Sequence, residues 1–364
     1  MKLHGRVAFA AIFVTTFVAC TLSQSLDYLT KGSDGAETGA PDGAATDAPA
    51  NVDGEALPPI RELATNQRAP RRLVQDANNL YWANDDGAIM TLPKAGGTPR
   101  EIAKSAVAGG IDLLAVDADP AGHVYVRAGT VVELFRVPKA GGALAKIAGG
   151  DPPIEGVLVD DRNLYLGRPD EFEIDGGVLL RAQKDGTNPV TLVTAVNPYA
   201  MALHEGVIVF NNTPVDENAD YEMRAIAKDA VPGSPTQLYA SSTAGGPLAD
   251  SLEGIAVDKD AIYYVEGGVV YRLPRLQSTA PEKLAQGQDI ENETRIAIDD
   301  LHVYVAEERT SSTLQRVVKT GGAAPTTIAV DLARPTSVVV DATAVYFTVL
   351  GPGTDTGKVL SIAK

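Results

Sequence analysis

The chain has few of the residues on which many metal, disulfide and nucleophile sites depend. Its 364 residues include one cysteine, four histidines and one tryptophan. A single cysteine cannot form a disulfide framework, and no histidine pair has the spacing of zinc ligands. No glycine-rich phosphate loop or serine-nucleophile motif is present. The sequence therefore predicts no metal and no cofactor, and it favours a non-enzymatic protein over an enzyme.

Basic residues and long apolar runs are also scarce. The 31 Lys and Arg residues face 47 Asp and Glu residues, for a formal net charge of −16. Nucleic-acid binding needs a basic surface, so we expect no nucleic-acid partner. The N-terminal apolar run, Val7 to Ala19, is too short to span a bilayer. It reads instead as the core of an export signal.

The residues around this run extend that interpretation. Lys2 and Arg6 precede it, and "FVAC" follows it, ending in Cys20. This ending resembles the lipobox of bacterial lipoproteins, in which the cysteine is lipidated after cleavage. We therefore predict a signal peptide over residues 1–19, a lipid on Cys20 and anchoring in the bacterial cell envelope, at the outer membrane. An ordinary signal peptide with a leftover cysteine is the alternative.

The next segment, residues 20–57, consists mainly of Gly, Ala, Asp, Pro and Thr. Such a composition cannot bury a core. We predict a flexible acidic tether here and a folded domain over residues 58–364.

The folded part repeats itself. "PKAGG" occurs at residues 93–97 and again 45 residues later. A basic residue recurs at nearly the same interval throughout: Lys94, Lys139, Lys184, Lys228, Arg275, Lys319 and Lys364. An aspartate that ends an apolar run and precedes a tyrosine also recurs, with a histidine in the fourth unit: Asp76, Asp117, Asp160, His204, Asp258, Asp299 and Asp341. This pattern indicates seven repeats of about 44 residues.

Each repeat is typical of four short strands bounded by Gly, Asp, Asn and Pro. Four-stranded units at this period predict an all-β protein, a seven-bladed β-propeller. "PKAGG" is expected in the hairpin between the third and fourth strands of a blade. The recurring tyrosines should pack between blades. The basic residues should be solvated strand ends weakly paired with the repeat aspartates, with a cationic ring as the alternative.

The seventh repeat ends at Lys364 without a fourth strand. The segment "PPIRELATN", Pro58 to Asn66, matches the fourth-strand pattern of the other repeats. We therefore predict that this N-terminal strand completes the last blade.

Several repeats resemble known propeller families. "LYWANDDGAIMTLPK" resembles the YWTD repeat, and "GIAVD…IYYVEGGVVYRL" resembles NHL-type repeats. Taken together, the chain resembles exported bacterial β-propeller repeat lipoproteins. This resemblance implies a fold over residues 58–364, but no particular activity.

Acidic loops offer weak candidates for calcium. Asp216, Asn218 and Asp220 alternate like the start of a calcium loop, but the later Gly and Glu of that motif are missing. "RPDEFEID", residues 168–175, is a similar acidic loop. We expect both loops to be solvated and to hold no metal.

The candidate site lies where the innermost strands begin. The loops between second and third strands vary most, which favours binding on that face. The residues five positions before each repeat landmark are all polar or amphipathic: Arg71, Asp112, Glu155, Tyr199, Glu253, Thr294 and Thr336. We predict that they form a polar ring that binds a protein, peptide or glycan. The protein is thus expected to be a monomeric binding or scaffold module, with a lyase or hydrolase using the ring carboxylates as the alternative.

Overall fold

A computed structural model describes most of the chain from residue 56 onward. The described ranges are 56–106, 111–128, 133–149, 153–170, 176–214, 220–242, 248, 252, 254–275, 280–286, 295–306 and 312–364. The predicted signal peptide, Cys20 and the tether as far as residue 55 lie outside them. Within these ranges, no helix is long and apolar enough to cross a membrane.

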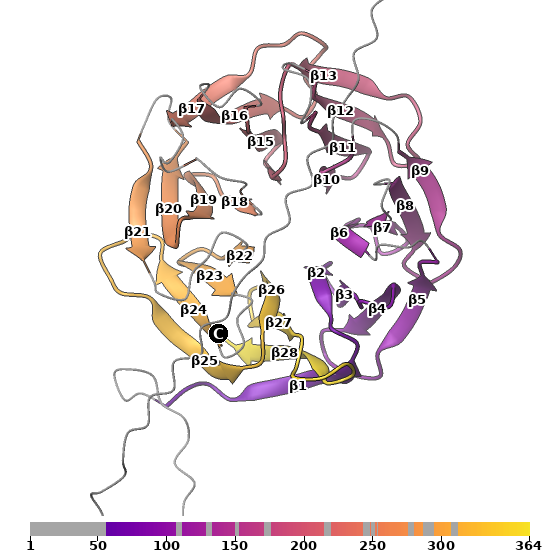
Figure 1. Cartoon of the computed structure of the whole chain (residues 1–364), viewed down its shortest axis with the longest axis vertical. Helices are drawn as coiled ribbons and strands as arrows, with labels where there is room; N and C mark the ends of the chain where they lie inside the picture. The colour runs from indigo at the N-terminus through magenta and orange to yellow at the C-terminus, as the bar shows by residue number, and fades with distance from the viewer. Residues whose placement is uncertain are drawn as a thin grey trace, which may run out of the picture. The chain divides into compact units, whose positions relative to one another are not determined.

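Seven four-stranded antiparallel sheets are arranged in a ring, as Figure 1 shows. We number the sheets as blades 1 to 7 in chain order. Blades 1 to 3 comprise β2 (Arg71–Gln75), β3 (Asn79–Ala83), β4 (Ala88–Pro93), β5 (Arg100–Lys104); β6 (Ile111–Val116), β7 (His123–Ala128), β8 (Glu133–Pro138), β9 (Ala145–Ala148); β10 (Gly156–Val159), β11 (Asn163–Arg168), β12 (Val178–Gln183) and β13 (Val190–Thr194).

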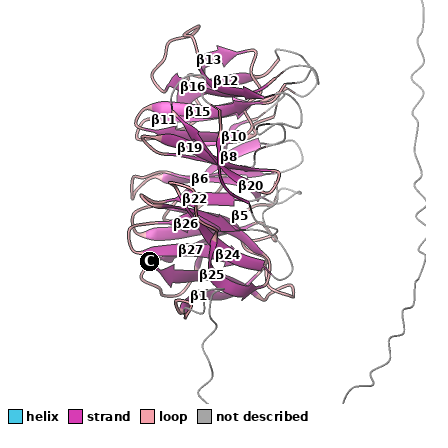
Figure 2. Cartoon of the chain, turned by 90° about the vertical axis from the view of Figure 1, so that its left-hand side faces the viewer, coloured by secondary structure: helices cyan, strands magenta, loops and turns pink. Residues whose placement is uncertain are grey.

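The second half of the ring has the same plan. Blades 4 to 7 comprise β14 (Met201–His204), β15 (Val207–Asn212), β16 (Tyr221–Ala227), β17 (Gln237–Ser242); β18 (Ile255–Val257), β19 (Ala261–Glu266), β20 (Val269–Pro274), β21 (Glu282–Gln286); β22 (Arg295–Ile298), β23 (His302–Ala306), β24 (Ser312–Val318), β25 (Thr326–Leu332); β26 (Pro335–Val340), β27 (Ala344–Val349), β28 (Gly357–Ala363) and β1 (Ile60–Gln67). In the side view of Figure 2, the described residues form strands and loops and no helix. The predicted seven-bladed propeller is therefore confirmed.

The ring is closed by its N-terminal strand, as predicted. β1 pairs antiparallel with β28, and blade 7 has the strand order β1-β28-β27-β26. Trp82 of blade 1, the only tryptophan, is fully buried against this closure. Its indole Nε1–H donates to Gln67 Oε1 of β1 at 3.2 Å. Blades 1 and 7 are thus joined through the last residue of β1.

The "PKAGG" motif occupies the predicted hairpins. Gly96 and Gly97 follow β4 with φ angles of 98° and 139°, and Gly141 follows β8 with a φ of 97°. Glycine adopts such positive φ values without a steric penalty. Between the blades, the repeat tyrosines are buried as predicted. Tyr81 of blade 1, for example, belongs to a core cluster that includes Val124 of blade 2.

The lysines differ from the prediction. Six pairs link the lysine of one blade to the repeat aspartate of the preceding blade, with Nζ to Oδ2 distances of 2.6–2.9 Å. We call each pair a Lys–Asp clamp. The six clamps are Lys94–Asp341, Lys139–Asp76, Lys184–Asp117, Lys228–Asp160, Lys319–Asp258 and Lys364–Asp299. The pairing with aspartate was expected.

The clamp lysine side chains range from 5% to 33% exposed, so the expected exposure is wrong for the most enclosed of them. The side chains of Lys139 and Asp76 are each only 5% exposed. The lysine reaches across the blade boundary because the turn between first and second strands and the hairpin between third and fourth strands share one face. We call this face the turn face. The clamp lysines are therefore part of the joint between blades, and they do not form a solvated cationic ring.

Each clamp aspartate also organises its own turn. Asp160 Oδ1 accepts hydrogen bonds from the backbone N–H groups of Arg162 and Asn163, and its Oδ2 accepts one from the Tyr165 hydroxyl at 2.9 Å. Burial alone would raise the pKa of Asp160. The bond from Lys228 and the two backbone amides outweigh burial and lower the pKa to about 2. The carboxylate is thus held ionised between two blades.

The joint between blades 4 and 5 departs from this scheme. His204 takes the aspartate position, and Arg275 takes the lysine position. The Arg275 guanidinium donates to the Asp258 carbonyl within its own blade at 2.9 Å. Among the described residues, this is the joint where no lysine meets a repeat aspartate across the boundary.

Candidate binding site on the channel axis

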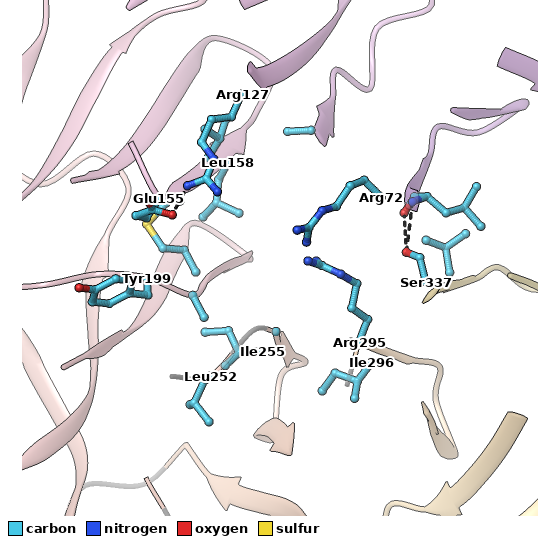
Figure 3. A pocket seen from close by; sticks show the side chains of 18 of the residues that line it. Arg72, Arg127, Glu155, Leu158, Tyr199, Leu252, Ile255, Arg295, Ile296 and Ser337 are labelled. Carbon is cyan, nitrogen blue, oxygen red and sulfur yellow. Dashed lines mark hydrogen bonds and ion pairs between the residues drawn. The ribbon is translucent and has the colours of Figure 1, made fainter. Parts of the chain in front are cut away.

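A cavity of about 540 Å³ lies on the axis of the ring, lined mainly by the innermost strands. Figure 3 shows it from close by. The innermost strand of a blade presents one edge to the channel and packs its apolar side chains between blades. Leu73 and Val338, for example, line the cavity and also belong to interblade core clusters. The cavity is therefore bounded by the rigid part of the fold.

The residue four positions before each repeat landmark contacts this cavity in six blades. These residues are Arg72, Gly156, Ala200, Gly254, Arg295 and Ser337. Four of them are small, and two are arginines. Small side chains leave space on the axis, and the arginines extend into it. This alternation gives the cavity both its volume and its charge.

Arg72 is held in an uncommon backbone conformation. Its φ is 58°, in the left-handed region, and the β2–β3 register shifts between Arg71 and Val74. Non-glycine residues in this region carry strain that the surroundings must support. Thr336 Oγ1 donates to the Pro70 carbonyl at 2.9 Å, and the Leu73 N–H donates to Ser337 Oγ at 3.1 Å. Blade 7 thus anchors the backbone on both sides of Arg72.

Two of the cavity arginines face each other. Figure 3 shows the Arg72 and Arg295 side chains extending toward one another across the cavity, with their guanidinium groups at its centre. They come from the innermost strands of blades 1 and 6. Blade 7 lies between these blades and contributes only the small side chain of Ser337 at the same level. The two arginine side chains therefore extend into space that the small Ser337 side chain leaves open.

A third arginine is used differently. Arg127, at the end of β7, forms an ion pair with Glu155 and donates to the Ile154 carbonyl at 3.1 Å. Its side chain is 13% exposed. The pair ties blade 2 to the beginning of the innermost strand of blade 3. Glu155 is thus a carboxylate held by its neighbour.

The opposite side of the cavity is mostly small and aliphatic, apart from Tyr199 and the Arg127–Glu155 pair. Blades 3 to 5 contribute Gly156, Ala200 and Gly254 at the level of the arginines, with Met201 and Ile255 beside them. A Cβ built at Gly254 would meet no described atom within 4 Å. The cavity therefore has Arg72 and Arg295 on the side of blades 1 and 6, and the side facing them combines small and aliphatic groups with Tyr199 and the Arg127–Glu155 pair.

The residues predicted from the sequence are only partly brought together. Glu155 and Tyr199 line the cavity, with the Tyr199 hydroxyl turned away from Arg72 and Arg295 (Figure 3). Arg71 lies outside it, and its Nε bonds to Asp85 Oδ1 at 3.2 Å.

Thr336 also lies outside the cavity, because it is buried and bonded to Pro70 and Thr348. The side chain of Asp112 lies outside the described residues, as do Glu253 and Thr294.

A shift of one residue explains which side chains the prediction missed. In blades 3 and 4 the innermost strand begins at Gly156 and Met201, so the residue five before the landmark is still in the entering loop. In blades 1 and 7 the strand begins earlier, and β2 and β26 both contain register shifts. In these two blades the side chains of Arg71 and Thr336 lie outside the cavity, and the residue that follows each of them lines it.

The acidic loops contribute no described metal site. Asp216 and Asn218 lie outside the described residues, as do residues 171–175. In the described part of the chain, no group of three or more His, Cys, Asp or Glu side chains is placed to hold a metal ion.

Comparison with known proteins supports the fold. No protein-family model and no curated protein matches the chain. Among solved structures, the WD40 propeller domain of Doa1 is similar with a TM-score of 0.59 at 11% identity, over 84% of this chain and 97% of that one. The computationally designed Ika8 protein is similar with a TM-score of 0.53 at 14% identity, over 83% and 98%.

A third structure comes from a bacterial surface protein. PorZ, a component of the type-IX secretion system of Porphyromonas gingivalis, is similar with a TM-score of 0.53 at 13% identity. The match covers 84% of this chain but only 39% of PorZ. The comparisons show a propeller fold. At these identities they show no family, so the resemblance to exported repeat lipoproteins stays a prediction.

Proposed function

We propose that this protein is an envelope-anchored, non-enzymatic propeller that binds a protein, peptide or glycan through its axial cavity and the adjoining variable loops. Cys20 would carry the lipid, and residues 20–57 would hold the ring away from the outer membrane. Propellers commonly serve as binding or scaffold modules. The observation that carries the proposal is the axial cavity of about 540 Å³, which is within the size range of ligand pockets.

The placement of charge supports binding over catalysis. A carboxylate-dependent lyase or hydrolase needs an acid or base that can reach its substrate. Glu155, the carboxylate among the described cavity residues, is already engaged by Arg127. Apart from the Tyr199 and Ser337 hydroxyls, the rest of the described lining consists of arginines and small or aliphatic groups, which recognise ligands but do not exchange protons at neutral pH.

The anchor is tested by fractionation. We expect the wild-type chain in the membrane fraction and the Cys20→Ser variant in the soluble fraction of the exporting cell. Recovery of both forms in the soluble fraction would contradict lipid anchoring.

Binding is tested with immobilised peptide and glycan arrays probed with the full chain carrying Cys20→Ser. The matched control adds Gly254→Phe, which should fill the apolar side of the cavity without backbone strain, because Gly254 does not have a positive φ. Array positions that bind the first form and lose at least about tenfold in signal with the second would support the proposal. Equal signals from both forms would contradict it, and turnover of a bound ligand would favour the enzyme.

A further inference from the structure

We propose that the axial cavity recognises an aliphatic carboxylate, with Arg72 and Arg295 binding the carboxylate group and the side of blades 3 to 5 binding its apolar body. This inference rests on the proposed function and narrows the ligand to one chemical class. Two kinds of ligand carry an aliphatic carboxylate of this kind: the C-terminal end of a peptide and a free short-chain carboxylic acid.

The first step is the convergence of two guanidinium groups. Arg72 and Arg295 point toward the same space from blades 1 and 6 (Figure 3). Guanidinium groups bind carboxylates through paired N–H···O bonds, and such charge-assisted bonds are stronger in a partly enclosed site than in water. An anion between these two side chains would be attracted by both of them.

The second step is the cost of holding Arg72 in place. A left-handed backbone at a non-glycine residue is unfavourable, and strain of this kind gathers at binding sites. Two side chains of blade 7, Thr336 and Ser337, secure the backbone beside it. Glycine would relieve the strain at this position, yet the residue is an arginine that extends into the cavity.

The third step is the polarity of the cavity. Opposite the arginines lie Gly156, Ala200 and Gly254, with Met201 and Ile255 beside them. The carboxylate described on this side, Glu155, is paired with Arg127. A ligand that is anionic at one end and apolar at the other would contact both kinds of surface. Phosphate fits less well, because the described lining offers few donors besides the arginines, and Ser337 already bonds to Leu73.

The test is calorimetric titration of the full chain with Cys20→Ser at about 0.15 M salt, where the Debye length is about 8 Å. The probes are hexanoate, the tripeptide Val-Ala-Leu, its C-terminal amide and inorganic phosphate. We expect hexanoate or the free tripeptide to bind, and the amide and phosphate to bind at least about tenfold more weakly. Binding of hexanoate alone identifies a free acid as the ligand type, and binding of the free tripeptide identifies a peptide C-terminus.

Variants locate the site. Arg72→Met and Arg295→Met should each weaken carboxylate binding about tenfold to a hundredfold, which is the range for loss of a charged hydrogen bond. Arg71→Met is the matched control, because it removes the same charge from the adjacent residue outside the cavity. Arg71→Met should change the carboxylate affinity by no more than about twofold, because salt screens an exposed charge that does not contact the ligand.

Three results would overturn the inference: equal binding of the tripeptide and its amide, phosphate binding as tight as hexanoate binding, or no binding of either carboxylate at 10 mM. Equal losses in Arg71→Met and Arg295→Met would also overturn it, since general electrostatics would then explain the binding. A neutral array ligand that is lost with Gly254→Phe would keep the proposed function and reject only this inference.

Discussion

On the turn face, six lysines each meet an aspartate of the preceding blade, whereas in the axial cavity two arginines meet each other. The first arrangement neutralises charge within the fold. The second brings two positively charged side chains together in a concave space, in a chain whose formal net charge is −16. This difference indicates that separate positions of the repeat serve blade joining and ligand binding. One end of each innermost strand joins the blades, and the channel-facing positions are left to vary.

The clamp positions and the channel-facing positions differ in how much their residues vary between repeats. The clamp keeps its Asp and Lys in six of seven joints and changes at His204 and Arg275. The channel-facing position holds Arg, Gly, Ala, Gly, Arg and Ser in six blades, with no common side chain. A residue shared by every unit fits a packing role, and a residue that changes from unit to unit fits an asymmetric ligand.

The largest expected effect comes from opening the ring. Deletion of residues 1–67 removes β1, leaves the β28 edge unpaired and exposes Trp82, while deletion of residues 1–57 leaves β1 in place. We expect the longer deletion to remove most of the roughly 5–15 kcal/mol of a native domain, and the shorter one to leave the melting temperature unchanged. Trp82 fluorescence during thermal unfolding reports both. Equal melting of the two truncations would contradict the closure.

The second-largest effect is expected from acid, which protonates the clamp aspartates and removes their ion pairs. Asp160 and Asp258 have pKa values lowered to about 2 by their lysine partners and backbone amides, which outweigh burial. A folded-state pKa below the unfolded value means that their stabilisation is complete above about pH 4 and is lost as the pH falls toward 2. We expect a loss of up to about 2 kcal/mol per clamp over this window. Urea unfolding between pH 6 and pH 2 measures it, and a flat profile would contradict the role of the clamps.

A single buried clamp should matter more than an exposed pair. Lys139→Met leaves the Asp76 carboxylate buried without its partner and should cost about 3 kcal/mol. The matched control is Lys104→Met, whose Nζ to Asp86 pair is half exposed and should contribute less than about 1 kcal/mol. Chemical denaturation of both variants makes the comparison. The double variant Lys139→Met/Asp76→Asn should recover part of the lost unfolding free energy. If Lys139→Met costs no more than Lys104→Met, the buried clamp is no more stabilising than the exposed pair.

The irregular joint offers the smallest effect. His204→Asp combined with Arg275→Lys would place the missing pair between blades 4 and 5. We expect a gain of about 1 kcal/mol or less, because Glu205 and Gly206 give that turn a different backbone, with φ values of 47° and 81°. Chemical denaturation measures the change. A loss of stability would mean that this joint is built around His204.

The fold could be read from the sequence because its repeats are regular. "PKAGG" and the Asp-to-Tyr spacing set the blade count, and the unclaimed segment before residue 67 indicated the closing strand. The burial of Lys139 could not be read, because it depends on how closely two blades approach. In blade 1 the cavity is lined by Arg72 and not by the predicted Arg71, because a register shift in β2 and a left-handed Arg72 are local features of the backbone that spacing alone does not reveal.

The central claim is that the clamps hold the ring and the cavity arginines bind. One paired experiment tests it most directly: calorimetric titration of Arg295→Met and Lys139→Met with the tighter-binding carboxylate, alongside denaturant unfolding of both. We predict that Arg295→Met loses about tenfold or more in affinity and keeps its unfolding free energy within about 0.5 kcal/mol, while Lys139→Met does the reverse. If Arg295→Met is destabilised as much as Lys139→Met and affinity follows stability in both, the cavity arginines are structural and the account is contradicted.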